Sequence, residues 1–182
     1  MDEICLRTAY PADAAGIARL DVETWQATYA GILGTPYLAG LSPARREAGW
    51  SSVIDRTPRD VHLALAGETI VGFGTCGASR SDPDFPGEIF TLYVAPDWQN
   101  QGIGRRLLLA MFAQLVDRGY NAAVIWVLRE NASRFFYQRL GGREVRRKLL
   151  PFNGTQVPAC GYGWADLRGY LSARTGAAES EG

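Results

Sequence analysis

A glycine-containing turn between a strand pattern and a helix pattern constrains the fold of this chain more than any other feature. The turn covers residues 99–104 and reads QNQGIG. The segment before it, EIFTLYVAPDW, is rich in β-branched and aromatic residues, and Pro96 ends it. The segment after it, RRLLLAMFAQLVDRG, repeats apolar residues at helical spacing, and Gly119 suits its C′ position. The sequence therefore predicts a strand, a tight turn and a helix that begins at the turn.

A turn of this kind is a binding site for anions. The first N–H groups of a helix have no partner within the helix, and the helix dipole favours negative charge there. Gly102 and Gly104 carry no Cβ, so a phosphate can approach their backbone closely. A Walker loop would have Lys-Ser/Thr where Arg105-Arg106 stand, and a dinucleotide-binding turn would have a third glycine where Leu107 stands. The turn thus predicts a phosphorylated ligand of another kind.

The remaining pattern, Q-x-x-G-x-G, resembles motif A of the GNAT N-acetyltransferase superfamily, whose loop holds the pyrophosphate of coenzyme A. The longer stretch LYVAPDWQNQGIGRRLL resembles it further. NASRFFYQRLGG, which starts at Asn131, resembles motif B, N-x-x-A/S-x-x-F-Y-x-x-x-G, with Phe136-Tyr137 as its aromatic pair. Arg134 stands where small residues are common, and Gly142 replaces the usual aromatic residue. The resemblance covers residues 60–165 well and residues 1–55 more loosely.

The resemblance implies an α/β fold of the mixed α+β type, a strongly twisted mixed sheet of about seven strands flanked by about four helices. In similar proteins two central strands splay apart after a bulge in the fourth strand. The coenzyme lies in the V-shaped gap, where its pantetheine amides pair with the exposed backbone. We expect residues 1–172 to form a single N-acetyltransferase domain and residues 173–182, which are small and polar, to form a disordered tail.

Local signals place further elements along the chain. Pro11 and Asp13 open a helix, and Ser42-Pro43 form an N-cap and N1 pair for another helix, while a broken helix and loop are expected between these two. DVHLALA and TIVGFGTC read as two strands joined by a turn at residues 67–68. A last pair of strands is expected around a turn at residues 153–154, which read Asn-Gly.

Composition excludes several other classes of protein. The chain has 182 residues, of which 47% are hydrophobic, enough for one substantial core. Its formal net charge of +0 predicts no nucleic-acid partner. Cys5, Cys76 and Cys160 are scattered, which favours a reducing compartment over a disulfide framework. No signal peptide, membrane span or metal-ligand cluster is recognisable. We expect a cytoplasmic monomer or homodimer with no metal and no membrane partner.

The resemblance also implies a set of contacts to acetyl-CoA. The backbone of the turn would hold the pyrophosphate, where Arg105 and Arg106 either add charge-assisted contacts or form a solvated helix face. The backbone of the preceding strand would lie along the pantetheine and the thioester, with one N–H free for the oxyanion, a role worth ~3 kcal/mol. Asn131 would cap the following helix, bind the pantetheine carbonyl, or do both. The expected contacts are Leu92, Tyr93, Val94, Gln99, Gln101, Gly102, Ile103, Gly104, Arg105, Asn131, Ser133 and Tyr137.

Tyr137 is the candidate general acid. An unperturbed tyrosine has a pKa of about 10 and is protonated at neutral pH. A departing thiolate, whose pKa is about 8.5 in a comparable thiol, can accept that proton. The alternative role for Tyr137 is that of a packed aromatic residue beside Phe135 and Phe136.

Glu88 is the candidate general base, because a primary ammonium must lose a proton before it attacks. Alternation along the strand places Glu88 on the same face as Leu92 and Val94, so its carboxylate would point into the cleft and act through water. The alternative is a strand-end carboxylate in solvent. His62 has a suitable intrinsic pKa but starts another strand.

Four aromatic residues are candidates for the acceptor side, namely Trp25, Tyr29, Tyr37 and Trp50. They would wall an apolar or cationic pocket, in which Trp25 and Tyr29 bind the substrate, or they would anchor helices to the sheet.

The sequence therefore predicts an acetyl-CoA-dependent N-acetyltransferase. Its expected acceptor is a primary amine of a small molecule that attacks directly in a ternary complex. The alternatives are N-acetylation of a peptide or protein by the same chemistry, and a non-catalytic module that binds acyl-CoA. The intact glycine turn and Tyr137 favour catalysis.

Overall fold

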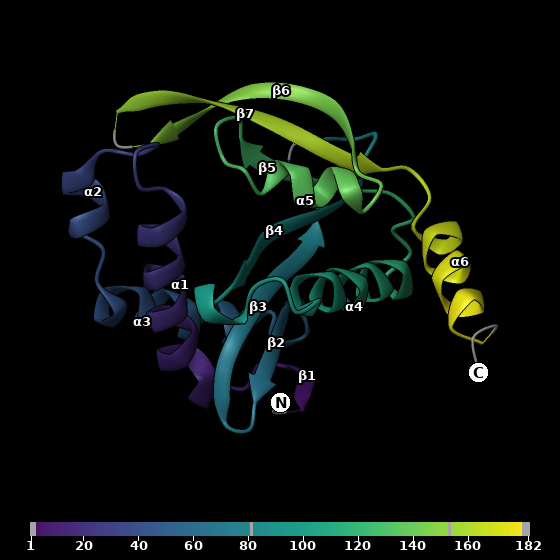
Figure 1. Ribbon diagram of the computed structural model, residues 1–182, viewed down its shortest axis with the longest axis horizontal. Coiled ribbons are helices and arrows are strands. Elements are labelled where there is room, and N and C mark those ends of the chain that lie inside the picture. The colour runs from purple at the N-terminus through teal and green to yellow at the C-terminus, as the bar shows by residue number, and fades with distance from the viewer. Residues whose placement is uncertain (1–2, 81, 153, 180–182) are drawn as a thin grey trace.

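A mixed sheet flanked by helices forms the body of the protein, as the computed structural model shows (Figure 1). The structure describes residues 3–80, 82–152 and 154–179. The sheet has 7 strands in the order β1-β2-β3-β4-β5-β7-β6, which confirms the expected fold class. The strands are β1 (Ile4–Thr8), β2 (Val61–Ala66), β3 (Thr69–Ala78), β4 (Gly87–Val94), β5 (Ala123–Leu128), β6 (Arg143–Phe152) and β7 (Thr155–Trp164). The α-helices are α1 (Ala14–Thr28), α2 (Thr35–Ala39), α3 (Pro43–Arg56), α4 (Ile103–Asp117), α5 (Arg134–Arg139) and α6 (Leu167–Glu179).

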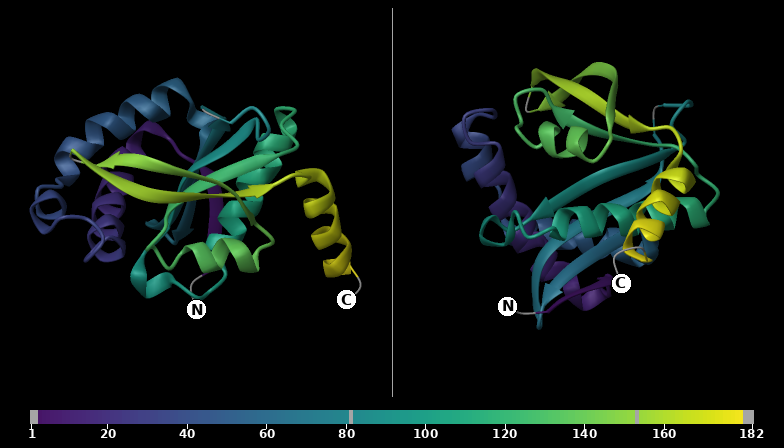
Figure 2. Two further views of the ribbon diagram at one scale, coloured as in Figure 1. Left: turned by 90° about the horizontal axis from the view of Figure 1, so that it is seen from above. Right: turned by 45° about the vertical axis from the view of Figure 1, so that its right-hand side comes forward.

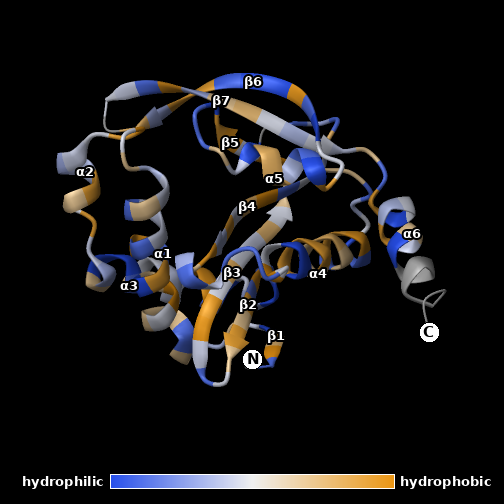
Figure 3. Ribbon diagram, viewed as in Figure 1, coloured by the Kyte–Doolittle hydropathy of each residue, from blue (hydrophilic) through white to orange (hydrophobic). Residues whose placement is uncertain are grey.

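Helices pack on both faces of the sheet. On one face, the apolar side of α4 lies against β3, β4 and β5 through residues such as Leu108 and Met111. On the other face, Ile17 of α1 and Ile54 of α3 pack with Phe73 of β3. The long hairpin of β6 and β7 reaches toward α1 and α2 (Figure 2). Hydrophilic residues gather on its outer strand β6, the edge of the sheet, whereas the inner strands are largely apolar (Figure 3). This layering follows from burial of the apolar stripes that the sequence showed.

The parallel strands β4 and β5 separate partway along their length. Residues 87–89 pair with residues 123–125, and past that point both strands continue without pairing to each other. The register between β3 and β4 shifts at the same place, because Thr75 pairs with Thr91 while the next residue, Cys76, pairs with Ile89. Phe90 is therefore an extra residue in β4, a β-bulge. The expected bulge in the fourth strand and the splayed pair of central strands are both confirmed.

The bulge changes the face to which Glu88 belongs. Ile89 and Leu92 both pack into the cluster on the α4 face, although they are three positions apart. Because neighbouring side chains alternate, Glu88 lies opposite Ile89, on the face where Tyr93 packs against the α1–α3 layer. The prediction that Glu88 shares a face with Leu92 is therefore wrong, since simple alternation does not hold across an inserted residue.

Short-range signals mark the element ends as expected. α4 ends in a Schellman motif, in which Gly119 (φ 89°) donates its N–H to Val116 and Tyr120 donates to Leu115. The β2–β3 turn contains Gly67 (φ 57°) and the β6–β7 turn contains Gly154 (φ 78°). Asn153, expected in that last turn, lies outside the described residues.

The C-terminal segment differs from its expectation, because α6 continues to Glu179 where disorder was expected from residue 173. The start of α6 is anchored, since Leu167 is fully buried and the Tyr170 ring meets Phe112 edge-on with 5.5 Å between centroids. Such anchoring lets helix-forming residues extend the helix beyond the packed turn. With the short α2, this helix brings the α-helices of the described chain to more than the expected four. Residues 180–182 lie outside the described part.

Asp13 fastens β1 to the start of α1 and gives a first prediction. Its carboxylate accepts hydrogen bonds from the Arg7 guanidinium at 2.6 and 2.9 Å and from the Tyr10 N–H at 2.7 Å. The hydrogen bonds from Arg7 hold the pKa of Asp13 below its usual range. A lowered folded-state pKa gives stability that is present above the unfolded pKa and is lost as pH falls through the folded pKa. We expect Asp13→Asn to lower the free energy of unfolding by about 1–2 kcal/mol at pH 7.

Urea unfolding of both proteins between pH 7 and pH 3 measures this effect. The difference between them should shrink once the pH falls below about 4, the unfolded pKa of an aspartate. The control is Asp55→Asn, a change in an exposed carboxylate of α3, with an expected effect within about 0.5 kcal/mol at either pH. A difference that stays constant down to pH 3 would contradict the assigned role of Arg7.

Candidate active site

The turn that precedes α4 presents free backbone donors. Asn100 (φ 61°) and Gly102 (φ 78°) both adopt the left-handed conformation, which turns the chain from β4 into the helix. The first helical hydrogen bond runs from the Arg106 N–H to the Gly102 carbonyl at 3.0 Å. The N–H groups of residues 103–105 therefore precede the helical ladder and have no partner within it. A Cβ built on Gly102 would meet nothing within 4 Å, so the space at the turn is open to a phosphate.

Two glutamines brace this turn with their side chains. Gln99 Nε2 donates to the Val94 carbonyl at 3.1 Å, and Gln101 Nε2 donates to the Asp97 carbonyl at 3.2 Å. Both were expected as coenzyme contacts. The structure assigns their side chains to the shape of the turn and leaves their backbone as the part that can meet a ligand.

A pocket of about 500 Å³ joins the turn to the splayed end of β4, the start of α5 and the end of α1. It contains most of the expected coenzyme contacts together with residues that the sequence did not single out. The expected residues in its lining are Leu92, Tyr93, Val94, Gln99, Gly102, Ile103, Gly104, Arg105, Ser133 and Tyr137. The additional ones are Thr24, Thr28, Trp98, Asn100, Ala132, Phe136 and Arg139. The two motifs, far apart in sequence, therefore meet in one cavity.

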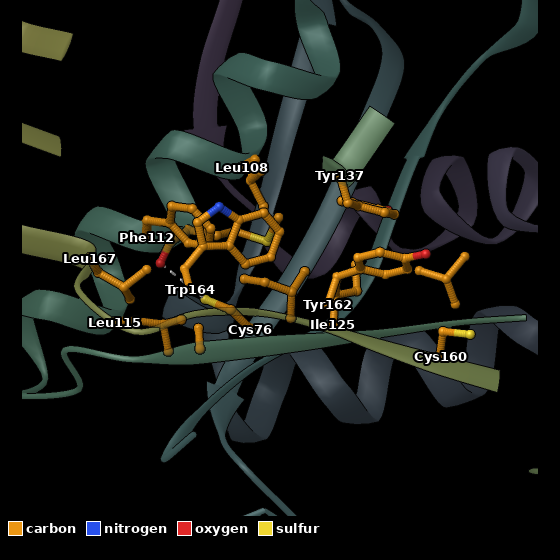
Figure 4. Close-up of a cluster of buried hydrophobic side chains, with 14 residues drawn as sticks. Cys76, Leu108, Phe112, Leu115, Ile125, Tyr137, Cys160, Tyr162, Trp164 and Leu167 are labelled. Atoms are coloured by element: carbon orange, nitrogen blue, oxygen red, sulfur yellow. Dashed lines mark hydrogen bonds between the residues drawn. The ribbon is translucent and has the colours of Figure 1, made fainter. Parts of the chain in front are cut away.

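Tyr137 both packs in the core and reaches this pocket. Its ring stacks on Tyr162, with 6.5 Å between ring centroids (Figure 4). It also meets Phe136 edge-on, with 5.1 Å between centroids. Its side chain is only 5% exposed, and this burial raises its pKa above the usual value for tyrosine. The hydroxyl therefore keeps its proton throughout the neutral range. Tyr137 is therefore a packed aromatic residue that also lines the pocket, a position compatible with the predicted role as general acid.

Asn131 joins a polar network that crosses from α1 to α5. Its Oδ1 accepts the Ser133 N–H at 2.8 Å, which forms an Asx turn directly before α5, whose N-cap is Ser133. The hydroxyls of Tyr29 and Tyr93 lie 3.3 Å apart. Burial raises the pKa of Tyr29, and hydrogen bonds with Tyr93 and Asn131 offset part of that rise. Asn131 and Tyr29 are thus placed beside the pocket, in contact with its lining residues Ser133 and Tyr93.

The two candidate bases lie outside the lining of the pocket. Glu88 is 4% exposed and accepts hydrogen bonds from Arg80, from the N–H at 3.0 Å and from Nη2 at 3.3 Å. Its carboxylate is therefore held in a fixed orientation. His62 lies in β2, and burial lowers its pKa, which favours the neutral imidazole.

The aromatic candidates for the acceptor side divide into two places. Trp25 lies 4.8 Å from Tyr29, 6.4 Å from Tyr37 and 6.1 Å from Phe152, measured between ring centroids. This aromatic group fills the space between α1, α2 and the β6–β7 hairpin. Trp50 is elsewhere, because its Nε1 donates to the buried Asp21 at 3.0 Å. Trp50 is therefore not part of the expected cluster of four aromatic residues. It belongs instead to the contact between α1 and α3.

Phosphate is the anion that the donor set at the turn fits best. The turn supplies uncapped N–H groups, a glycine with open space and the guanidinium of Arg105, while the splayed strands expose backbone for an extended ligand. Among the described residues, no group of three or more His, Cys, Asp or Glu side chains is arranged to hold a metal ion. No helix in the described ranges is both long and apolar enough to cross a bilayer.

Comparison with known proteins agrees with this geometry. The family model described as "Acetyltransferase (GNAT) family" matches residues 21–142. The chain is 30% identical to the uncharacterized N-acetyltransferase YuaI of Bacillus subtilis, over 90% of this chain and 94% of that protein. It is 43% identical to the mycothiol acetyltransferase of Rhodococcus opacus, over 53% of this chain and 32% of that protein. The crystal structure of PaiA N-acetyltransferase from Thermoplasma acidophilum in complex with coenzyme A superposes with a TM-score of 0.67 at 22% identity. This match covers 86% of this chain and 97% of that one.

Proposed function

This chain belongs to the acetyltransferase (GNAT) family, and on that premise we propose that it transfers the acetyl group of acetyl-CoA to a primary amine of a small molecule, by direct attack in a ternary complex. The observation that carries the proposal is the single pocket that contains both the uncapped start of α4 and the Tyr137 side chain. One end of this pocket suits a phosphorylated carrier, and the other end holds a buried phenol that stays protonated.

Acetyl-CoA supplies the activated acyl group as a thioester, and the chain supplies its positioning. The N–H groups of residues 101–105 hold the pyrophosphate, and the open space at Gly102 allows its close approach. Gly104 serves the packing instead, because a Cβ there would lie 3.2 Å from Phe136. The unpaired end of β4, with the backbone of Leu92, Tyr93 and Val94, runs along the pantetheine and offers an N–H to the thioester oxygen. Asn131 and Ser133 support the same arm from the start of α5.

Proton transfer falls to Tyr137 and Glu88. Tyr137 donates its hydroxyl proton to the departing thiolate, because a thiolate is a stronger base than water. Glu88 receives the proton of the acceptor ammonium through water, because its carboxylate lies outside the pocket lining, where Arg80 holds it in place. Trp25 and Tyr29 contact the acceptor at the end of α1, beside the pocket residues Thr24 and Thr28.

A change of Glu88 to glutamine tests the role of the carboxylate as base. Glutamine keeps the size of the side chain but cannot take up the proton, so we expect kcat/KM for the amine to fall ~10-fold or more at pH 7. The dissociation constant for CoA should remain within about twofold, because Glu88 does not line the pocket.

The control for this change is Glu68→Gln, which removes an exposed carboxylate at the β2–β3 turn. It should leave kcat/KM as it is. A Glu88→Gln enzyme with the parental kcat/KM would reject Glu88 as the base.

The proposed reaction is tested by incubating the purified protein with acetyl-CoA and a panel of amines, amino acids and peptides, while thiol release is followed. Release that depends on a small amine supports the proposal, as does the similarity to a mycothiol acetyltransferase. Release with peptides alone would move the acceptor to the peptide class. Binding of acetyl-CoA with no thiol release on any acceptor would identify a binding module instead.

We place the reaction in the cytoplasm. The described cysteines, Cys5, Cys76 and Cys160, are all free thiols, and two of them are buried in the core. Free thiols of this kind fit a reducing compartment.

A further inference from the structure

Two arginines line the pocket that we propose for the coenzyme. Arg105 belongs to the first turn of α4, and Arg139 is the last residue of α5. Both side chains are exposed. Within the ranges that the structure describes, neither guanidinium is in an ion pair with a carboxylate. Two positive charges that are not compensated by the protein therefore lie in the wall of one cavity.

Contacts between α4 and α5 bring these two arginines near each other. A Cβ built on Gly104 would lie 3.2 Å from Cζ of Phe136, so the first turn of α4 touches α5 there. Arg105 directly follows Gly104. Arg139 follows Phe136 by three positions, which places both residues on one side of α5. Both arginines therefore lie near the contact between Gly104 of α4 and Phe136 of α5.

Tyr170 of α6 provides a second, independent link. Its hydroxyl donates to the Leu140 carbonyl at 2.6 Å, next to Arg139 in the chain. Burial raises the pKa of this phenol, while the positive charges of Arg174 and Arg105 oppose the rise. Tyr170 is therefore close to Arg105 on one side and to the end of α5 on the other.

A second phosphate is the chemistry that this pair of charges would recognise. In the proposed function the backbone N–H groups at the turn hold the pyrophosphate, and among the described residues neither guanidinium pairs with a carboxylate. CoA carries, besides its pyrophosphate, a phosphate on the ribose 3′ oxygen. A guanidinium binds such a group through paired charge-assisted hydrogen bonds. We propose that Arg139, together with Arg105, binds the ribose 3′-phosphate and makes the enzyme select CoA over 3′-dephospho-CoA.

This proposal rests on the proposed function and is tested by comparing two ligands that differ in one phosphate. Titration calorimetry gives the dissociation constants of CoA and 3′-dephospho-CoA for the parent protein, and their ratio measures the selection. Because exposed ion pairs are weak, we expect the parent to bind CoA about tenfold more tightly than 3′-dephospho-CoA at low salt. Raising NaCl from 50 to 500 mM should bring the ratio toward one, since salt screens exposed charges.

Arginine variants assign the selection to residues. Arg139→Gln should lower the ratio to about three or less, and the double change Arg105→Gln with Arg139→Gln should bring it to about one. Arg19→Gln removes an exposed arginine of α1 and controls for total charge, so it should leave the ratio unchanged. Thermal unfolding of each variant confirms that it is folded.

Each other outcome has a definite meaning. A parental ratio near one, or a ratio that Arg139→Gln leaves at its parental value, overturns the proposal. An equal loss of affinity for both ligands in Arg139→Gln also overturns it, because the side chain would then act on the pyrophosphate or on the fold. If the parent binds neither ligand, the proposed function fails first, and the two failures are thereby distinguished.

Discussion

Replacing Gly102 by tryptophan is expected to weaken CoA binding at least about 100-fold. Gly102 stands at the start of α4 with φ 78°, and a Cβ there would meet nothing within 4 Å. A large side chain would occupy this open space and keep a pyrophosphate away from the N–H groups of residues 103–105. Charge-assisted hydrogen bonds contribute about 1.5–3 kcal/mol each, and the loss of two exceeds the ~2.7 kcal/mol that corresponds to 100-fold.

Titration calorimetry with CoA measures this effect, and the opposite end of the same helix supplies the control. Gly119 also has a positive φ, of 89°, and open space around its Cβ position. Gly119→Trp therefore brings a comparable backbone strain of about 1–2 kcal/mol without approaching the pocket. It should lower thermal stability by a similar amount and leave CoA affinity intact. Parental CoA affinity in Gly102→Trp would reject the turn as the binding site for pyrophosphate.

Changing Tyr137 to phenylalanine is expected to lower kcat about 100-fold while the dissociation constant for CoA changes by less than about threefold. The ring keeps its packing on Phe136 and Tyr162, so only the proton donor is lost. Burial raises the pKa of Tyr137, so the parental phenol remains protonated at alkaline pH. The parental kcat should therefore show no decline caused by this group up to about pH 10, the usual tyrosine pKa.

Steady-state kinetics over a range of pH, with calorimetry for CoA, test this prediction. The matched control is Tyr162→Phe, because Tyr162 stacks on Tyr137 and its hydroxyl pairs with Gln138 at 3.4 Å outside the pocket lining. That variant should keep a kcat within about threefold of the parent, since no proton donor is removed from the pocket. Equal kcat values for Tyr137→Phe and the parent would exclude Tyr137 as the acid.

The parts of the site that depend on local sequence could be predicted from the sequence. The glycine turn, the start of α4 and its end at Gly119 follow from backbone conformation and helical periodicity within about 20 consecutive residues. The structure confirms these elements and brings Tyr137 and the turn into one pocket. The mixed sheet and its splayed strands were accessible only through resemblance to a family, because pairing between distant strands leaves little trace in local patterns.

Glu88 shows where a pattern rule fails. Alternation predicts its face correctly only in a regular strand, and the extra residue Phe90 reverses the relation between Glu88 and Leu92. Nothing in the composition of EIFTLYV marks the bulge, since the glycine or proline that often signals one is absent from it. The error therefore came from the register with β3, a property of two strands together.

Trp50 and Arg139 illustrate a second reason why the sequence alone does not place every residue of the site. The resemblance groups Trp50 with Trp25 in a segment expected over the acceptor side, but Asp21 on α1 accepts a hydrogen bond from the Trp50 indole, which packs in another cluster. Sequence patterns do not single out Arg139, whose place in the pocket depends on how α5 packs against α4. Such contacts are set by tertiary packing rather than by propensity or spacing.

The short parallel pairing between β4 and β5 makes the middle of the sheet mechanically weaker than its two halves. Within the described part of the chain, the ladder between the two halves of the sheet pairs residues 87–89 with residues 123–125. Force that pulls β7 away from β3 must pass through this narrow junction and the side chains around it. A pantetheine arm hydrogen-bonded to the unpaired ends of both strands would hold the two strands together at a second place, farther along them than the paired residues. The donor substrate would then also make the sheet more rigid for as long as it stays bound.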